Sequence, residues 1–336
     1  MWVARSGDRA GETNVIGSSH CSRRSVLSWG AAALALAPGL GRADATDAPA
    51  PPVDGDSIQG VSDANQRLTL ETYINGQGPF RFVVDTGADQ TIISADVALK
   101  LGLLAGDQVI VQGISRSSPA QTVQLNKLSF GHVTIDSLRV PVLPSKWLGA
   151  DGYLGLDVID GRRVIFDFQN DTLIVTDSRG ASEPARWLSA DQALVRASGA
   201  HGRLTAVNCR VDGVHAHAFI DSGAQASIAN THLFARLQEM GKSYIGDFVI
   251  PIVGVTGGEA HGRLTRISSI QLGTLDFTNS TLVISDLPVF DVWGLADRPA
   301  ILIGMNFLRK TSSLSIDYGT KELLIKVANV GIARAI

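Results

Sequence analysis

The chain has 336 residues, 45% of them hydrophobic and 18% charged, so it can bury a large core and is not an intrinsically disordered polypeptide. A formal net charge of -3, without any long basic run, excludes the kind of basic surface by which proteins bind nucleic acids. The length is enough for two domains of ordinary size.

The N-terminal region has the pattern of an export signal. Arg23 and Arg24 stand directly before an apolar stretch over residues 26–40, and the small residues Ala43 and Ala45 follow it. The stretch is shorter than the ~20 apolar residues that a membrane-spanning helix needs. We therefore predict that residues 1–45 are a signal peptide that resembles the twin-arginine type. The protein would be periplasmic or secreted, with no stable membrane association after cleavage; the alternative is an uncleaved anchor.

The amino-acid composition of the chain changes twice after the signal. Residues 46–64 are rich in Ala, Pro, Asp and Gly and indicate a flexible linker. From Leu68 onward, short runs of Val, Ile, Leu, Phe and Thr alternate with Gly, Asn and Asp, which is typical of a mostly β protein. Helical patterns are scarce; the best are Ala95–Lys100 and Thr231–Met240, and each follows a predicted strand.

An internal repeat divides the rest of the chain. The segment 82–94 recurs as 219–230, with Asp85 and Asp221 at matching places. Four more segments recur in the same order: Val111–Ser115 as Ile252–Thr256, 128–131 as 270–273, 153–159 as 302–308, and 164–168 as 314–318. One match could be chance, but an ordered series indicates a duplicated unit. We predict two similar lobes, residues 65–180 and 186–330.

Each copy carries an aspartate in a setting suited to acid–base chemistry. Asp85 and Asp221 each end an apolar strand and precede a hydroxyl residue and a glycine. Glycine permits a sharp turn and a close approach of another chain, and the hydroxyl can form hydrogen bonds between the copies. Two carboxyl groups that face each other share one proton. The ionised group can then deprotonate a water while the neutral group donates to the carbonyl oxygen of an amide.

These two loops resemble the active-site loops of aspartic proteases, and their Gly-Ala continuation resembles the retropepsin branch. The resemblance implies a mostly β fold with two pseudo-twofold-related β-barrel lobes and an active-site cleft between them. It implies an aspartic endopeptidase, a monomer with an internal pseudo-dimer, whose peptide or protein substrate is hydrolysed by water activated between Asp85 and Asp221. No metal or cofactor is implied. Four further loop residues would support the pair: Thr86, Gly87, Ser222 and Gly223.

The same resemblance places flaps over the cleft. Two matching segments occupy the flap positions, and their substrate-facing residues would be Gly113, Ile114, Gly254 and Val255. Asp89 would contact the substrate backbone or form a salt bridge. Gln225 stands at the matching place in the second lobe, so we expect an asymmetric cleft.

Other interpretations remain open at this point. The chain could be a catalytically inactive two-lobed periplasmic protein that binds a peptide or a sugar, or a structural domain whose aspartates only cap turns. His215 and His217 share one face of a predicted strand and could begin a metal site, but no third ligand stands nearby at a telling spacing. Cys209 would be the lone cysteine of the mature chain and suits a buried position.

Overall fold

The computed structural model describes residues 2–4, 57–178, 188–189, 191–198, 204–242 and 244–327. All of them belong to one unit, which comprises Met1–Ser6 and Gly55–Ile336. Most of the predicted signal peptide and the first part of the predicted linker therefore lie outside the described residues. Ser57–Ser62, at the end of that predicted flexible linker, form a paired strand instead. Within the signal region only β1 (Trp2–Ala4) is described, and it pairs with the outer edge of β6 (Ala105–Gln112). No helix among the described residues is long and apolar enough to span a membrane.

The first lobe contains a closed barrel. Its six strands pair in the ring order β3–β4–β9–β5–β8–β7 and return to β3. The strands are β3 (Leu68–Ile74), β4 (Gln77–Val84), β5 (Ile92–Ser94), β7 (Ser117–Phe130), β8 (Val133–Leu143) and β9 (Gly152–Leu154). β6 pairs with β7 as a hairpin that extends from the ring. The helices are α1 (Ala95–Lys100), α2 (Ser145–Leu148) and the 3-10 turn η1 (Leu156–Val158).

The second lobe repeats this plan strand for strand. Its ring order is β13–β14–β19–β15–β18–β17 and back to β13, and β16 extends from β17 as a hairpin. The strands are β13 (Thr205–Val211), β14 (Val214–Ile220), β15 (Ile228–Ala229), β16 (Tyr244–Val253), β17 (Glu259–Leu272), β18 (Leu275–Ile284) and β19 (Ala300–Ile303). The helices are α3 (Thr231–Glu239), α4 (Pro288–Val292) and α5 (Met305–Leu308). The predicted mostly β fold with two barrel lobes is confirmed.

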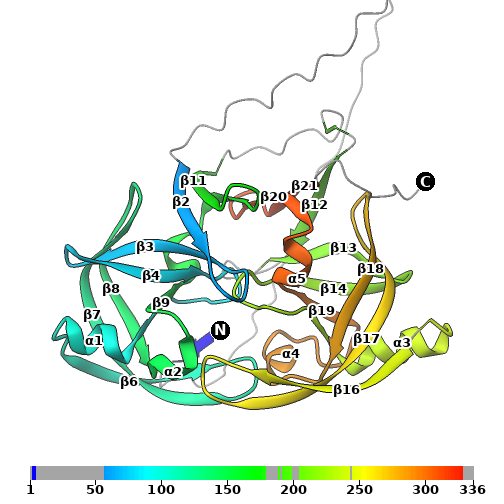
Figure 1. Ribbon diagram of the computed structural model, residues 1–336, viewed down its shortest axis with the longest axis horizontal. Helices are drawn as coiled ribbons and strands as arrows, with labels where there is room; N and C mark the ends of the chain where they lie inside the picture. The colour runs from blue at the N-terminus through cyan, green and yellow to red at the C-terminus, as the bar shows by residue number, and fades with distance from the viewer. Residues whose placement is uncertain are drawn as a thin grey trace, which may run out of the picture. The chain divides into compact units, whose positions relative to one another are not determined.

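An antiparallel sheet joins the lobes (Figure 1), in the order β2–β11–β10–β20–β21–β12. The strands are β2 (Ser57–Ser62), β10 (Arg162–Asp167), β11 (Thr172–Asp177), β12 (Gln192–Ser198), β20 (Thr311–Asp317) and β21 (Glu322–Val327). The first lobe supplies one half of this sheet and the second lobe the other half. The central pair, β10 and β20, is where the halves meet, with Ile165 opposite Ser315.

Local sequence explains the elements that carry the site. β14 alternates buried and exposed residues and then ends in the buried run Ala218, Phe219 and Ile220, directly before Asp221. Both predicted helices form, although the second ends one residue earlier than expected. Ser94 caps α1 by accepting a hydrogen bond from the Val97 amide, and Asn230 caps α3 in the same way. One hydrophobic cluster runs through both lobes and holds the strand ends in place.

Candidate active site

Parallel strand pairs bring the two aspartates to equivalent places. β4 pairs with β9 and β14 with β19, both in parallel. The Asp85 amide donates a hydrogen bond to the Leu154 carbonyl at 3.0 Å, and the Asp221 amide donates to the Ile303 carbonyl at 3.0 Å. Both aspartates are only 7% exposed. Each carboxyl group therefore stands at the end of a buried strand that its own barrel fixes.

The hydroxyl residues after the aspartates connect the two loops reciprocally. Thr86 Oγ1 donates to the Ile220 carbonyl at 2.9 Å and accepts from the Ser222 amide at 3.0 Å. Ser222 Oγ donates to the Val84 carbonyl at 2.7 Å and accepts from the Thr86 amide at 3.1 Å. Serine thus makes in the second lobe every hydrogen bond that threonine makes in the first. The four bonds fix the relative position of the loops, because all of them cross between lobes.

The glycines of the two loops let the carboxyl groups approach each other. A methyl group on Gly223 would lie 2.6 Å from both carboxylate oxygens of Asp85, and one on Gly87 would lie 2.6 Å from Asp221 Cγ. Each carboxyl group therefore packs against the backbone of the opposite loop, where only glycine leaves room. The Gly87 amide donates to Asp85 Oδ1 and the Gly223 amide to Asp221 Oδ1, each at 2.9 Å.

The surroundings of the pair oppose ionisation of both carboxyl groups at once. Burial, reinforced by the nearby charge of Asp85, raises the pKa of Asp221 to about 7. Hydrogen bonds from the amides of Gly223 and Ala224 act in the opposite direction, but they do not offset the burial. The pair is therefore expected to hold one proton between its two carboxyl groups up to about pH 7.

A second hydrogen-bond network fixes the loop of the first lobe that carries Asp85. The Asp157 carboxylate accepts from the Thr91 amide at 2.9 Å and from Thr91 Oγ1 at 2.7 Å. Thr91 Oγ1 in turn accepts from the Gly155 amide at 3.1 Å. Burial raises the pKa of Asp157 despite these hydrogen bonds, and the charge of Asp89 adds to the rise.

The second lobe builds the same network without a charge. Asn306 Oδ1 accepts from the Ser227 amide at 2.9 Å and from Ser227 Oγ at 2.8 Å. Ser227 Oγ accepts from the Gly304 amide at 3.0 Å. An amide oxygen is therefore sufficient for this position, and the carboxylate of Asp157 is not required by the hydrogen bonding.

Replacement of Asp157 by asparagine should leave the fold intact and give a thermal midpoint at neutral pH equal to that of wild type or slightly above it, because Asp157 as a whole is exposed and water screens much of the cost of its charge. When the pKa of an acid is raised in the folded state, the folded protein loses stability as the pH rises through that pKa, because the charged form of the acid is disfavoured in the fold. Asparagine removes this penalty and keeps the acceptor that Asn306 supplies in the second lobe. The difference between variant and wild type, measured by thermal unfolding, should vanish in acid. A lower midpoint for the variant at neutral pH would show that an asparagine cannot replace Asp157 as Asn306 does in the second lobe.

The two flaps meet at their tips. The first flap is the turn between β6 and β7, and the second is the turn between β16 and β17. Thr256 Oγ1 donates to the Arg116 carbonyl at 2.8 Å, and Arg116 Nε donates to the Thr256 carbonyl at 3.0 Å. Ser115 Oγ donates to the Gly258 carbonyl at 2.9 Å. The flaps are therefore joined to each other above the aspartates.

Trp147 from α2 supports the joined flaps. Its indole lies against Gly257 at the second flap tip, where a methyl group would lie 2.5 Å from Cζ2. The Arg116 guanidinium lies over the same indole, 5.5 Å from the ring centre. The first lobe therefore contacts the tips of both flaps through one aromatic side chain.

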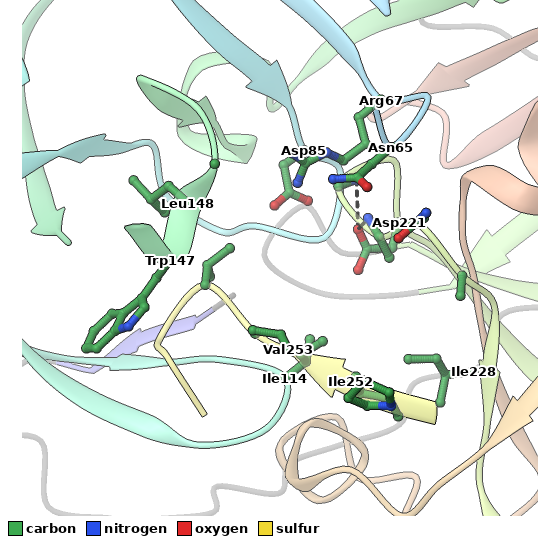
Figure 2. Close-up of a pocket in the computed structure, with 18 of the residues that line it drawn as sticks. Asn65, Arg67, Asp85, Ile114, Trp147, Leu148, Asp221, Ile228, Ile252 and Val253 are labelled. Atoms are coloured by element: carbon green, nitrogen blue, oxygen red, sulfur yellow. Dashed lines mark hydrogen bonds between the residues drawn. The ribbon is translucent and has the colours of Figure 1, made fainter. Parts of the chain in front are cut away.

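A cavity of about 430 Å³ lies between the aspartates and the flaps, and Figure 2 shows its walls. This volume is within the range of sites that bind small molecules or short peptide segments. The second lobe and the first flap supply one apolar wall of the cavity. Another wall contains aromatic side chains. The lining residues include Asp85, Asp221, Asn65, Arg67, Trp147, Leu148, Tyr153, Ile114, Ile228, Ile252, Val283, Gly254 and Val255.

Most of the residues predicted from sequence lie in or directly beside this cavity. Asp85, Asp221, Gly223, Ile114, Gly254 and Val255 line it. Thr86, Gly87 and Ser222 lie behind the carboxyl groups, and Gly113 lies at the contact between the flap tips. Asp89 is half-buried beside Asp157 and is not among the lining residues, so its contact with substrate stays a prediction. Gln225 does line the cavity.

Several lining residues could not be predicted from the sequence. Asn65 and Arg67 were assigned only to the start of a lobe, and Trp147 had no signal of its own because it belongs to a four-residue helix. His215 and His217 both lie on β14, and no group of three possible metal ligands occurs among the described residues. Cys209 is fully buried, and burial raises the pKa of its thiol to about 12.

Two comparisons with known proteins were made, and one of them identifies the family of this chain. A search of curated proteins finds no match to this chain. The model of the aspartyl protease family matches residues 70–158 and 207–307, so each match contains one of the two aspartates with its glycine turn. The matched residues make up more than half of the chain, and the chain therefore belongs to the aspartyl protease family.

Proposed function

We propose that this protein is an aspartic endopeptidase that hydrolyses peptide bonds with water activated between Asp85 and Asp221. The observation that carries the proposal is the packing of each carboxyl group against the glycine of the opposite loop, inside a cavity closed by two flaps. The raised pKa of Asp221 supports it, because a pair that shares one proton offers both an acid and a base.

In the proposed reaction Asp85 acts as the base and Asp221 as the acid. Asp85 removes a proton from a water whose oxygen attacks the carbonyl carbon of the substrate. Asp221 gives its proton to the carbonyl oxygen, which forms a neutral tetrahedral diol. Return of a proton to the amide nitrogen and breakage of the carbon–nitrogen bond release an acid and an amine. No bond forms between the protein and the substrate, so no acyl-enzyme accumulates.

A peptide library provides the direct test. The chain without residues 1–45 is incubated with the library in ordinary and in heavy-oxygen water, and the products are identified by mass spectrometry. We expect cleavage, incorporation of one solvent oxygen into each new carboxyl group, and inhibition by a statine-type peptide that mimics the tetrahedral diol. Absence of cleavage at every pH tested would leave a peptide-binding module instead of an enzyme.

The pH profile of kcat/KM should have a descending limb near neutrality. Asp221 has a raised pKa, so it keeps its proton up to about pH 7 and loses it above. With both carboxyl groups ionised no acid remains, and kcat/KM should fall about tenfold per pH unit. The measurement is kcat/KM for one peptide between acid and about pH 9, with folding monitored by circular dichroism at each pH. A folded protein that is fully active in base would contradict the assignment of Asp221.

A further inference from the structure

A short loop in the wall of the cavity carries a polar side chain that the proposed chemistry does not use. The loop joins β2 to β3 and spans residues 63–67. Asn65 is half-buried and lines the cavity together with Asp85 and Asp221, as Figure 2 shows. Within the part of the chain that the structure describes, its side-chain amide makes no hydrogen bond; only its backbone amide does.

Asp63 makes the loop rigid. Its Oδ1 accepts from the backbone amides of Asn65 at 2.8 Å and of Arg67 at 2.9 Å. Its backbone amide donates to the Arg67 carbonyl, and its carbonyl accepts from the Gln66 amide. The other carboxylate oxygen lies 2.6 Å from Arg67, in an ion pair that is largely buried. Such a loop presents Asn65 in one backbone position, which lowers the entropy cost of using its amide.

Arg67 connects the loop to the floor of the cavity. Its side chain donates a hydrogen bond to the Tyr153 hydroxyl and lies over the same ring, 5.4 Å from the centre. Burial raises the pKa of Tyr153 to about 12, so the hydroxyl keeps its proton and donates to the Leu148 carbonyl at 3.0 Å. The loop, β9 and α2 are thus joined through buried polar groups on one side of the cavity.

The second lobe holds the loop from outside. Arg309 follows α5 and donates from Nε to the Gln66 carbonyl at 3.0 Å. The same guanidinium donates to the Phe168 carbonyl at 2.9 Å and to Asp171 at 2.8 Å. The residue next to Asn65 is therefore fixed by an arginine of the opposite lobe, and the position of Asn65 depends on how the two lobes are joined.

We infer that Asn65 is a substrate-binding residue whose side-chain amide hydrogen-bonds the main chain of the bound peptide away from the cleaved bond. The inference rests on the proposed endopeptidase function. A carboxamide offers a donor and an acceptor, which match the carbonyl and amide of a peptide unit, and it adds no charge beside the catalytic pair. Lys146 and Gln225 also line the cavity, but both are exposed and longer, so more side-chain entropy is lost when they are ordered.

The test compares Asn65→Ala with wild type on the best-cleaved library peptide and on versions of it shortened one residue at a time from each end. Loss of one uncharged hydrogen bond should lower kcat/KM for the full peptide about 3- to 10-fold, mainly through KM. The penalty should disappear once the contacted residue is removed from the peptide. The thermal midpoint should not change. Asn126→Ala, at an exposed asparagine of β7, is the matched control and should behave as wild type.

Arg309→Met supplies an independent arm. It should reproduce part of the KM effect, and combining it with Asn65→Ala should add little to the KM of the single Asn65 variant. A penalty of equal size for every peptide length would mean that Asn65 acts on the catalytic pair, and no penalty at all would mean that it binds nothing; either result overturns the inference while wild-type cleavage leaves the proposed function standing. If the wild type cleaves no peptide, the proposed function itself has failed.

Discussion

Replacement of either aspartate of the proposed catalytic pair by asparagine should reduce kcat for peptide hydrolysis by about 10³-fold or more. Asparagine keeps the size of the side chain and its acceptor oxygen, so the hydrogen bonds from the amides of Gly87 and Gly223 can persist. It cannot accept the proton of water, and it cannot give one to a carbonyl oxygen. Because the proposed reaction needs Asp85 and Asp221 together, the double variant should be hardly less active than either single variant.

The stability of these variants separates a catalytic defect from a folding defect. Burial makes ionisation of the pair costly, so Asp221→Asn should unfold at the same temperature as wild type or above it at neutral pH. Asp136→Asn, at an exposed position of β8, controls for the loss of one carboxylate and should keep full activity. Retention of wild-type kcat by a folded Asp85→Asn or Asp221→Asn variant would show that the pair does not perform the reaction.

The second large effect is expected at Ser222, on stability as well as activity. Ser222→Ala removes the hydrogen bond to the Val84 carbonyl and the acceptor of the Thr86 amide. Both abandoned groups are buried, and an unsatisfied buried group costs about 1–3 kcal/mol. The free energy of unfolding, measured with urea, should therefore fall by about 2–4 kcal/mol. Because these bonds also fix the distance between the loops, kcat should fall more than about tenfold.

Ser222→Thr is the matched control for that experiment. The first lobe already has threonine at the equivalent place, where Thr86 Oγ1 donates to the Ile220 carbonyl and accepts from the Ser222 amide. Threonine at residue 222 should therefore restore most of the stability and activity that alanine removes. If Ser222→Ala unfolds like wild type, the reciprocal hydrogen bonds do not contribute to stability as described, and the joining sheet alone must align the loops.

The parts of this site that local sequence determines were predictable. Asp85 and Asp221 are visible in sequence because the buried strand, the aspartate and the glycine turn are contiguous, and because the pattern occurs twice. The flap positions followed from the same repeat. Helix α1 was equally visible, since its capping serine and its apolar residues are neighbours in the chain.

Contacts between distant residues were not predictable in this way. Arg309 contacts Gln66, a partner 243 positions away, and nothing near either residue marks the pairing. Asn65 faces the cavity because an aspartate two residues earlier folds its loop, a geometry that resembles any surface turn when read as sequence. Trp147 gains its role from a flap of the opposite lobe. Such roles depend on how the lobes are joined, and a repeat in the sequence does not show which residues of the two copies meet.

The sheet that joins the lobes has a consequence for how this protein can evolve. Each lobe supplies its own half, and among the described strands of this sheet β10 and β20 are the pair that connects the halves, which is the arrangement that two copies of one short polypeptide could form by association. In such an association every substitution appears twice. A single gene that encodes both halves is free of that constraint, so equivalent positions can differ, as Asp157 of the first lobe and Asn306 of the second lobe do. A chain that carries both lobes can therefore change on one side of its pseudo-twofold axis without changing on the other, and selection can act on each side separately.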